Sequence, residues 1–469
     1  MHYQPTLKSV RSHPLPGWYD DAKLGIFIHW GPYSVPAFAP PGDPMQILDG
    51  KTGFGNFPYA EWYLNSIRIP GTPAWCHHNQ VYGEGAAYEQ FAPIFNQQIA
   101  GWNPQEMADL FVRAGARYVV LVTKHHDGFL MWPSKHPNPR RSGYQVTHDV
   151  TGELTAAVNA RGMQMGLYYS SLLDWTFTSR PIRDFADLLA GSNISPAYHA
   201  YVLAHWHELI ESYHPMLLWS DIGYPPRQKL PRLFADYYNQ YPQGVVNDRW
   251  WQIPSILYNS LGRWLIRRVI RMMDLTKPLP IPHCDFDTAE YTSSPVIRRR
   301  KWEADRGVGS SFAYNQFEDE TACLKAADAI RLLVDVVSKN GNLLLNVGPR
   351  PDGSIPSYQV AVLEGLGDWL RANGEAIYGA HPWVRPQDAC GADGEVHYTV
   401  RPGALYVVVT RLPADRRLLL GADGLEGECR LLETGEILAV ECAGDMIQVS
   451  LPASLGEDAI PVLKIAKPV

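Results

Sequence analysis

Short apolar runs alternate with amphipathic stretches from the start of the chain to about residue 380. Runs rich in β-branched and aromatic residues are typical of buried strands, and apolar residues at helical spacing indicate helices between them. We expect strands at Gly25–Trp30, Tyr118–Lys124, Gly166–Ser170, Met216–Asp221, Val245–Asp248, His283–Phe286, Ser310–Tyr314 and Asn342–Gly348. The clearest helices are expected at Pro104–Ala114, Ser195–Tyr213 and Thr321–Lys339. Eight units of this kind predict an α/β fold with a parallel sheet, a closed (β/α)8-like TIM barrel.

The pattern changes after residue 380. Segments such as Val396–Val400 and Ala404–Thr410 alternate apolar and polar positions, and turns rich in Gly and Asp separate them. This texture predicts a small antiparallel β-sandwich. We therefore expect two domains: a (β/α)8-like barrel over residues 1–380, which would carry the chemistry, and a C-terminal β-sandwich over residues 381–469.

Composition narrows the range of functions. Lys and Arg number 41 against 48 Asp and Glu, which gives a formal net charge of −7 at pH 7. A negative long-range field repels nucleic acid and anionic membranes, so neither is expected as a main partner. Six cysteines without C-x-x-C spacing favour reduced thiols, and no apolar signal segment or membrane-length apolar run is visible. These features predict a cytoplasmic protein. Aromatic residues, at 12% of the chain, suit the stacking of flat apolar faces such as those of sugar rings.

One stretch is more basic than the rest of the chain. Leu261–Met273 places Arg263, Arg267 and Arg271 along one side of an expected amphipathic helix. Because the whole chain is acidic, we interpret this helix as an oligomer contact or a lid beside the site, in preference to a membrane-surface element.

Ionisable residues gather where the expected strands end. His29 ends the first strand, His125 and His126 follow the second, Asp221 ends the fourth and Arg249 follows the fifth. In a parallel barrel these ends converge on one face, which is where such barrels hold their active sites. The repetition across separate strands predicts a polar pocket with a chemical function.

Two chemistries fit this pocket. Three imidazoles with carboxylates suit a divalent metal, and His29, His125 and His126 would be its ligands. Two observations count against a metal site. Consecutive strand residues point to opposite faces, so His125 and His126 could bind one ion together only if the strand had already become a loop. In addition, no H-E-x-x-H spacing occurs in the sequence. His205 and His207 are expected in a helix. His77 and His78, together with Cys76, are expected in a loop.

The second chemistry is sugar recognition. Neutral imidazoles would hydrogen-bond ring hydroxyls while Trp30, Trp62 and Trp219 offer apolar faces. Glycoside hydrolysis also needs two carboxyl groups, one ionised and one protonated. Asp221 is the leading nucleophile because it ends an apolar strand. Spacing alone does not choose the acid, for which the candidates are Glu61, Glu84, Glu290 and Glu303, all expected in loops.

Several runs together resemble a known family. They are KLGIFIHWGPYSVPA, EWY, AGARYVVLVTKHHDGFLMW, GLYYS, LLWSDIGYP, NDRW, PHCDFDTAEY, VSKNGNLLLNVGPRPDGSIP and GEAIYG. Over about residues 18–380 the chain is similar to the α-L-fucosidases of glycoside hydrolase family 29. The resemblance implies a retaining hydrolase that needs no metal or cofactor and acts on a fucosylated oligosaccharide or glycoconjugate, with a homo-oligomer as an open expectation. A non-catalytic fucose-binding protein is the further alternative.

The resemblance also assigns roles. Asp221 would be the nucleophile, and Glu290, the last acidic residue of DFDTAEY, the acid/base. Arg249 would keep Asp221 ionised, and Phe312 would pack on the C5 methyl group. The residues that would hold the fucose hydroxyls are His29, Glu61, Trp62, His125, His126, Tyr168 and Trp219. An extra stretch of roughly 25 residues between Arg249 and Pro282 puts the role of Arg249 and the aglycone side in doubt.

Overall fold

The computed structural model describes residues 2–42, 53–190, 195–226, 229–252, 281–421 and 427–466, together with residues 261, 264, 265 and 268. The basic helix expected over Leu261–Met273 therefore falls almost wholly outside the described residues. Two further observations concern the described chain: its six cysteines are free thiols, and it holds no helix of the length and apolarity needed to cross a membrane.

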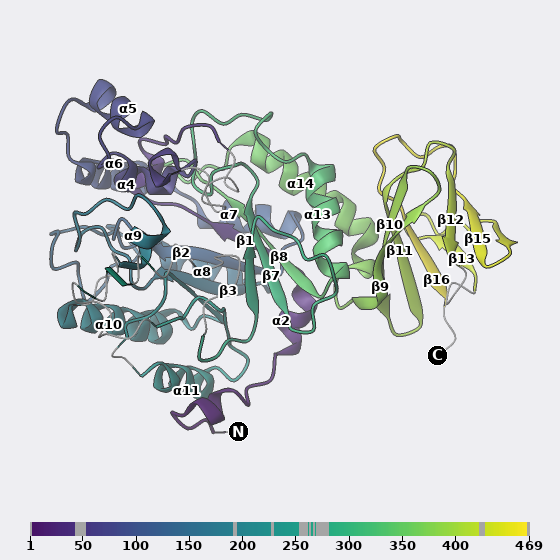
Figure 1. Ribbon diagram of the computed structural model, residues 1–469, viewed down its shortest axis with the longest axis horizontal. Helices are drawn as coiled ribbons and strands as arrows, with labels where there is room; N and C mark the ends of the chain where they lie inside the picture. Colours follow the sequence, from purple (N-terminus) through teal and green to yellow (C-terminus); the bar gives the residue numbers. More distant parts are fainter. Residues whose placement is uncertain are drawn as a thin grey trace.

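Eight parallel strands form a curled sheet in the order β5-β4-β3-β2-β1-β8-β7-β6. β1 pairs with both β2 and β8, so the first and the last strand of this sheet along the chain are neighbours (Figure 1). Between β5 and β6 the main-chain N–H of Asp285 donates to the carbonyl oxygen of Val246 at 2.9 Å. The predicted parallel barrel is confirmed. Its strands are β1 Leu24–Ile28, β2 Tyr118–Lys124, β3 Gln164–Ser170, β4 Leu217–Asp221, β5 Val245–Val246, β6 Asp287–Glu290, β7 Trp302–Gly307 and β8 Gly341–Val347.

Helices cover the outer face of the sheet and surround its mouth (Figure 1). The expected helices at 104–114 and 195–213 form as α7 and α10. The third expected helix begins late, at Ala326, because Thr321 closes a turn by donating to Asp319. The described helices are α1 Leu7–Val10, α2 Gly17–Ala22, α4 Tyr63–Ser66, α5 Pro73–Tyr82, α6 Phe91–Gln98, α7 Pro104–Arg113, α8 Val150–Asn159, α9 Phe185–Ala190, α10 Pro196–Tyr213, α11 Leu230–Gln240, α13 Ala326–Ser338 and α14 Ser357–Asn373.

Alternate residues of the strands belong to two different hydrophobic cores, one on each face of the sheet. Ile26 and Leu121 belong to the large outer cluster, which they share with helix residues such as Leu366. Phe27, Val120 and other residues at the intervening positions pack together on the inner side of the curled sheet. Because side chains of a strand alternate between its faces, the fully apolar strands are explained by burial on both sides.

Two of the eight predicted strands are wrong. Residues His283–Phe286 precede β6, because the side chain of Asp285 accepts hydrogen bonds from His13 and from the main chain of Val246. Residues Ser310–Tyr314 form a loop after β7, in which main-chain N–H groups donate to Glu61 and Glu318 instead of to a strand. Strand β7 was not predicted because its sequence, WEADRG, contains charged residues, which are unusual in a buried strand.

The C-terminal part forms two antiparallel sheets at one end of the molecule, beyond α13 and α14 (Figure 1). The predicted antiparallel sandwich is confirmed, whereas the domain boundary at 380/381 stays a prediction, with β9 beginning at His381. Its strands are β9 His381–Cys390, β10 Gly394–Arg401, β11 Ala404–Arg411, β12 Arg417–Gly421, β13 Cys429–Leu431, β14 Val440–Ala443, β15 Met446–Ser450 and β16 Val462–Ala466.

Candidate active site

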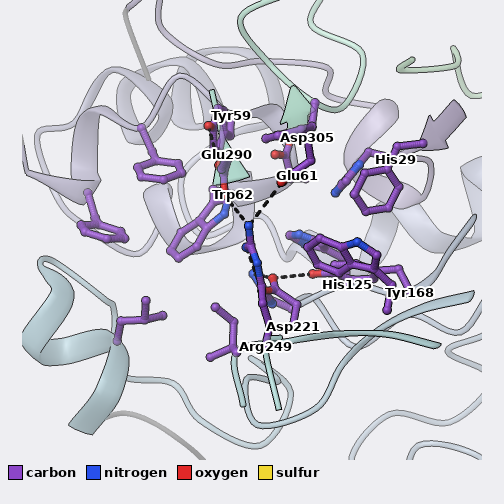
Figure 2. Close-up of a pocket in the computed structure, with 18 of the residues that line it drawn as sticks. His29, Tyr59, Glu61, Trp62, His125, Tyr168, Asp221, Arg249, Glu290 and Asp305 are labelled. Atoms are coloured by element: carbon purple, nitrogen blue, oxygen red, sulfur yellow. Dashed lines mark hydrogen bonds and ion pairs between the residues drawn. The ribbon is translucent and has the colours of Figure 1, made fainter. Parts of the chain in front are cut away.

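A cavity of about 140 Å³ opens at the C-terminal ends of the barrel strands (Figure 2). The eleven residues to which the resemblance assigned roles all line it: His29, Glu61, Trp62, His125, His126, Tyr168, Trp219, Asp221, Arg249, Glu290 and Phe312. The volume lies below the range of about 300–1,000 Å³ that is usual for drug-sized ligands. The cavity therefore has room for one small ring and not for a chain of them.

Asp221, the last residue of β4, is buried, and both oxygens of its side chain have partners. Its Oδ2 accepts a hydrogen bond of 2.8 Å from the Tyr168 hydroxyl, and its Oδ1 lies 3.3 Å from Arg249. The Nε2 atom of His126 is 3.8 Å away. Burial alone would raise the pKa of Asp221, but the charge of Arg249 and the Tyr168 hydrogen bond outweigh it and hold that pKa below its ordinary value. Asp221 is therefore a carboxylate at neutral pH.

Arg249 joins three carboxyl groups. One terminal nitrogen lies 3.3 Å from Asp221, and the other lies 3.3 Å from both Glu290 and Asp305 (Figure 2). The guanidinium carbon sits 4.7 Å from the centre of the Trp219 ring, over its face. One positive charge thus serves three acidic side chains. In the sequence, the extra stretch after Arg249 put the role of this residue in doubt. The structure places its side chain in direct contact with Asp221.

Glu290 and Asp305 are neighbours on adjacent strands. Glu290 ends β6 and pairs in register with Asp305 of β7. The Tyr59 hydroxyl donates to Glu290 at 2.9 Å, while the Oδ1 atom of Asp305 is buried and has no hydrogen-bond partner among the described residues. Burial and the nearby carboxylates raise the pKa of Asp305 well above its ordinary value despite Arg249. Among the carboxyl groups that contact Arg249, Asp305 is therefore the one whose protonated form burial favours.

The histidines of the cavity are neutral acceptors. Burial lowers the pKa of His29 to about 4 and that of His126 to about 3. Nδ1 of His29 lies 2.6 Å from the amide oxygen of Asn346, whose nitrogen donates to a main-chain carbonyl, so this Nδ1 carries the hydrogen. Nδ1 of His126 lies 2.7 Å from the Ser170 hydroxyl, which itself donates to a carbonyl oxygen, so the same holds there. In both rings Nε2 remains as an acceptor for a hydroxyl group.

The structure separates the four glutamates that spacing left open. Glu61 lines the cavity, accepts a hydrogen bond of 2.9 Å from the main-chain N–H of Ala313, and has its pKa raised to about 8 by burial, so it is a neutral hydroxyl donor at pH 7. Glu84 is exposed. Glu303 is not in a loop but in β7, below the cavity, where it accepts hydrogen bonds from Tyr19, Tyr118 and Trp219. Glu303 thereby fixes the indole on which Arg249 rests.

A model of the α-L-fucosidase family matches residues 1–375 of this chain. The chain belongs to the α-L-fucosidase family. Among its relatives, the human tissue α-L-fucosidase is 33% identical over 428 residues, which are 88% of this chain and 79% of that protein. An α-L-fucosidase of Dictyostelium discoideum is 32% identical over 436 residues, or 89% and 83%.

Solved structures agree with this family. A Thermotoga maritima α-fucosidase in complex with a mechanism-based inhibitor is 38% identical, with a TM-score of 0.85, and the match covers 99% of this chain and 100% of that one. The same enzyme in complex with fucose is also 38% identical, with a TM-score of 0.84 over the same shares.

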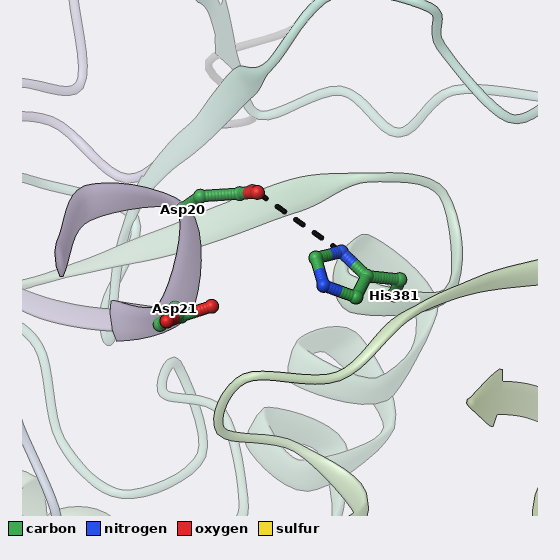
Figure 3. Close-up of side chains that lie close together, drawn as sticks. All are labelled: Asp20, Asp21 and His381. Carbon is green, nitrogen blue, oxygen red and sulfur yellow. Dashed lines mark ion pairs between the residues drawn. The ribbon is translucent and has the colours of Figure 1, made fainter. Parts of the chain in front are cut away.

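The α-L-fucosidase fold leaves the metal hypothesis without a suitable ligand set at the cavity. Within the described residues, the group whose ligand atoms all lie within 4.8 Å of one another is Asp20, Asp21 and His381 (Figure 3). These residues lie on α2 and at the start of β9, at the opposite end of β1 from the cavity. Asp20 already pairs with Lys301 at 2.9 Å. The ligand atoms of the three cavity histidines do not lie this close together, and Nδ1 of His29 and of His126 is already hydrogen-bonded to Asn346 and Ser170.

Of three further sequence expectations for this α-L-fucosidase, two are corrected and one is confirmed. Trp30 does not face the cavity: it points to the opposite side from His29, donates to the carbonyl of Arg350 and packs edge-on against Trp102. The Cys76-His77-His78 run lies on helix α5 and not in a loop. The pair His205/His207 lies on helix α10, as expected.

Sequence reasoning missed part of the lining: Phe27, Phe54, Phe57, Tyr59, Phe185, Leu188, Ile222 and Asp305. Asp305 could have been found if the alternation in WEADRG had been recognised as a strand. Tyr59 carries no such signal, because only the folded chain brings it to Glu290, 231 residues away.

Proposed function

We propose that this chain is a retaining, exo-acting α-L-fucosidase that hydrolyses terminal α-L-fucosyl residues of oligosaccharides or glycoconjugates. The observation that carries the proposal is the placement of an ionised Asp221 and of Glu290 on the two sides of one guanidinium, in a cavity sized for a single sugar. A terminal residue fits such a cavity, whereas an internal residue of a chain would need an opening at both ends.

The proposed reaction has two displacements. In the first, an oxygen of Asp221 attacks the anomeric carbon as the bond to the leaving oxygen breaks, and Glu290 gives its proton to that oxygen. The product is an ester between fucose and Asp221. In the second, Glu290 takes a proton from water, whose oxygen attacks the anomeric carbon and releases Asp221. The first step leaves Glu290 as a carboxylate beside Arg249, and the second step protonates it again.

Glu290 can supply a proton although it contacts Arg249, because three carboxyl groups share this single positive charge. Asp221 and Asp305 compete for the same positive charge, so the three carboxyl groups cannot all be ionised at low cost in a buried site. In the proposed reaction the leaving group receives its proton from Glu290.

The remaining residues would bind the sugar. Nε2 of His29 and of His126 accept from hydroxyl groups, and the protonated Glu61 donates. Phe312 would pack on the C5 methyl group, the feature that separates fucose from galactose. Burial of one methyl group contributes roughly 1 kcal/mol, so weak activity on the corresponding galactoside is expected.

The nucleophile is tested with Asp221→Gly. This variant should lose turnover of an aryl α-L-fucoside, and added azide should restore it with β-fucosyl azide as the product. The matched control is Asp445→Gly, the same change at an exposed turn of the sandwich, which should leave activity unchanged. Full activity of Asp221→Gly would contradict the assignment, and fucose binding without any turnover by the wild type would favour a non-catalytic protein.

The acid is tested with Glu290→Ala. Only substrates with poor leaving groups need a proton, so this variant should lose far more rate on an alkyl or sugar fucoside than on an aryl fucoside with an acidic phenol. Equal losses on both substrates would move the role of the acid to Glu61 or another residue.

A further inference from the structure

The loop after β7 carries one residue of the cavity lining, Phe312. Its side chain is buried, and its ring centre lies 5.0 Å from that of His29 and 5.1 Å from that of Tyr59. Phe312 therefore completes one wall of the cavity. A loop has no ladder of hydrogen bonds that would fix its backbone as a strand does. The groups that hold Phe312 in this position must therefore be side chains around the loop.

The peptide group that joins Ser310 to Ser311 is held at both ends. Its carbonyl oxygen accepts a hydrogen bond of 2.9 Å from the Tyr291 hydroxyl. Its N–H donates to Oε1 of Glu318 at 2.8 Å. A peptide group is planar, so two hydrogen bonds at its opposite ends fix the direction of its plane. The backbone that leads into Phe312 therefore cannot turn unless one of these bonds breaks.

The peptide group that follows Phe312 is also held at both ends. Its carbonyl oxygen accepts a hydrogen bond of 2.5 Å from the Asn346 side chain, and its N–H donates to Glu61 at 2.9 Å. Glu61 itself lines the cavity, so this second contact belongs to the site already described. Glu318 differs from Glu61, because it is not among the residues that line the cavity. It therefore acts on the loop from outside the cavity.

Glu318 occupies its place although this costs stability. Burial raises its pKa to about 7, even though the main-chain N–H groups of Ser311 and Ser310 lower it. Among the described residues, no Lys, Arg or His side chain forms an ion pair with it. Burial of an acidic group without a cation is unfavourable, and groups of this kind gather at functional sites. The cost indicates that Glu318 serves the loop it contacts.

Gly309 provides the space for Glu318. A Cβ atom at this position would lie 2.2 Å from Oε2 of Glu318, so any other residue would displace the carboxyl group. The carboxyl group thus rests directly on the backbone of the loop, one residue before the peptide group that it holds.

Loss of the Glu318 acceptor would release the first of the two peptide groups. The N–H of Ser311, a residue that is buried, would have no acceptor, so the peptide group would rotate toward another one. Phe312 follows directly in the chain, and its ring would move with this rotation. Glu61 and Asn346 would still hold the peptide group beyond Phe312. The displacement would therefore be confined mainly to the Phe312 ring.

We propose that Glu318 is a positioning residue that sets the selectivity of the site for a sugar with a methyl group at C5, because it holds Phe312 against that group. This inference rests on the proposed fucosidase activity and concerns the specificity of the same site. Glu318 acts through the N–H of Ser311 and does not touch the sugar. Its loss should therefore weaken the contact with the methyl group and leave the nucleophile and the acid in place.

The experiment compares two substrates that differ only at C5. An aryl α-L-fucoside carries the methyl group, whereas the matching aryl β-D-arabinopyranoside has the same ring and hydroxyl groups with a hydrogen atom in place of the methyl group. The quantity measured is the preference for the fucoside, which is the ratio of kcat/KM on the two substrates. Each variant is compared with the wild type on the same pair, so the intrinsic difference in their reactivity cancels.

Three variants are compared with the wild type. Glu318→Met is the main variant, because it keeps the length of the side chain and removes the acceptor. Glu318→Gln is the conservative variant and keeps one acceptor oxygen for Ser311. Glu320→Met is the matched control, the same change at an exposed residue of the same loop.

We expect the preference for the fucoside to fall about 3- to 5-fold in Glu318→Met, which is the size of one lost methyl contact. The value of kcat/KM on the arabinopyranoside should stay within about twofold of the wild type. In Glu318→Gln the preference should fall about twofold, because one of the two acceptor oxygens remains. Glu320→Met should match the wild type on both substrates.

Other results would overturn the inference. An unchanged preference in Glu318→Met would mean that Glu318 does not position Phe312, and equal losses on the two substrates would mean that it only supports the fold. If Glu318→Met does not fold, Glu318→Gln decides: a reduced preference supports the inference, and an unchanged preference overturns it. Failure of the wild type to hydrolyse the aryl fucoside would instead overturn the proposed function, so the two failures are distinguishable.

Discussion

Replacement of Arg249 by Met removes the cation shared by Asp221, Glu290 and Asp305 while keeping most of the side-chain volume. A unit charge 3.3 Å from a carboxylate contributes about 5 kcal/mol at an effective dielectric constant near 20. The guanidinium is divided among three carboxyl groups and its side chain is 23% exposed, so we expect roughly 2 to 3 kcal/mol of this to act on Asp221. That loss corresponds to a rise of about 2 units in the pKa of Asp221.

The sign of the effect on activity follows from the ionised form of Asp221. Arg249 helps to hold the pKa of Asp221 below its ordinary value, and catalysis needs the carboxylate. Activity is therefore present above this pKa and is lost as the pH falls through it. In Arg249→Met the acidic limb of the kcat/KM profile should move about 2 units toward higher pH. At a pH below the new limb, kcat/KM should fall by about 100-fold.

The assay is the pH profile of kcat/KM on an aryl fucoside with an acidic phenol, because this substrate does not need the proton of Glu290. Arg249→Lys is the control: it keeps one positive charge but cannot reach three carboxyl groups at once, so its acidic limb should stay near that of the wild type while its rate falls. An acidic limb that does not move in Arg249→Met, whatever the loss of rate, would refute the electrostatic account of Asp221.

Three further predictions concern Asp305 and the fold. Asp305→Asn replaces a buried acid, whose pKa burial raises, by a neutral side chain of the same shape, so the free energy of unfolding should fall less steeply as the pH rises than in the wild type, as measured by urea titrations at several pH values; an unchanged pH dependence would count against a raised pKa of Asp305. Gly25→Ala places a Cβ atom 2.3 Å from the buried Tyr118 ring and should lower the free energy of unfolding by about 1–3 kcal/mol in urea titrations, whereas Gly101→Ala, which meets nothing within 4 Å, should be nearly neutral. Lys124→Met leaves the buried Asp174 without its ion-pair partner at 3.1 Å and should cost about 3–5 kcal/mol by the same measurement, and a variant of wild-type stability would show that this ion pair does not stabilise the fold.

Much of the fold was predictable because its strands are buried on both faces. Tyr118–Lys124 is apolar almost throughout and was placed to the residue, and Leu217–Asp221 was placed to within one residue. The errors fall where side-chain chemistry departs from that rule. The strand Trp302–Gly307 contains charged side chains that are buried. Ser310–Tyr314 has a strand-like composition, but its main-chain N–H groups donate to the side chains of Glu61 and Glu318.

The polar pocket was predictable for a related reason. Parallel strands end on one face of a barrel, so residues such as His29 and Asp221, each at the end of an apolar run, had to converge there. The sequence therefore determined the parallel barrel, the convergence of the strand-end histidines with Asp221, and, through resemblance, the family.

Tertiary structure alone decided the partners within that pocket. Which glutamate faces Asp221, that Arg249 reaches three carboxyl groups, and that Tyr59 holds Glu290 all depend on side chains up to 231 residues apart. Their distances come from the packing of separate loops, and no local pattern encodes them. The physical reason is that burial periodicity is a property of each strand, whereas electrostatic coupling belongs to the set of groups that packing brings within a few ångströms.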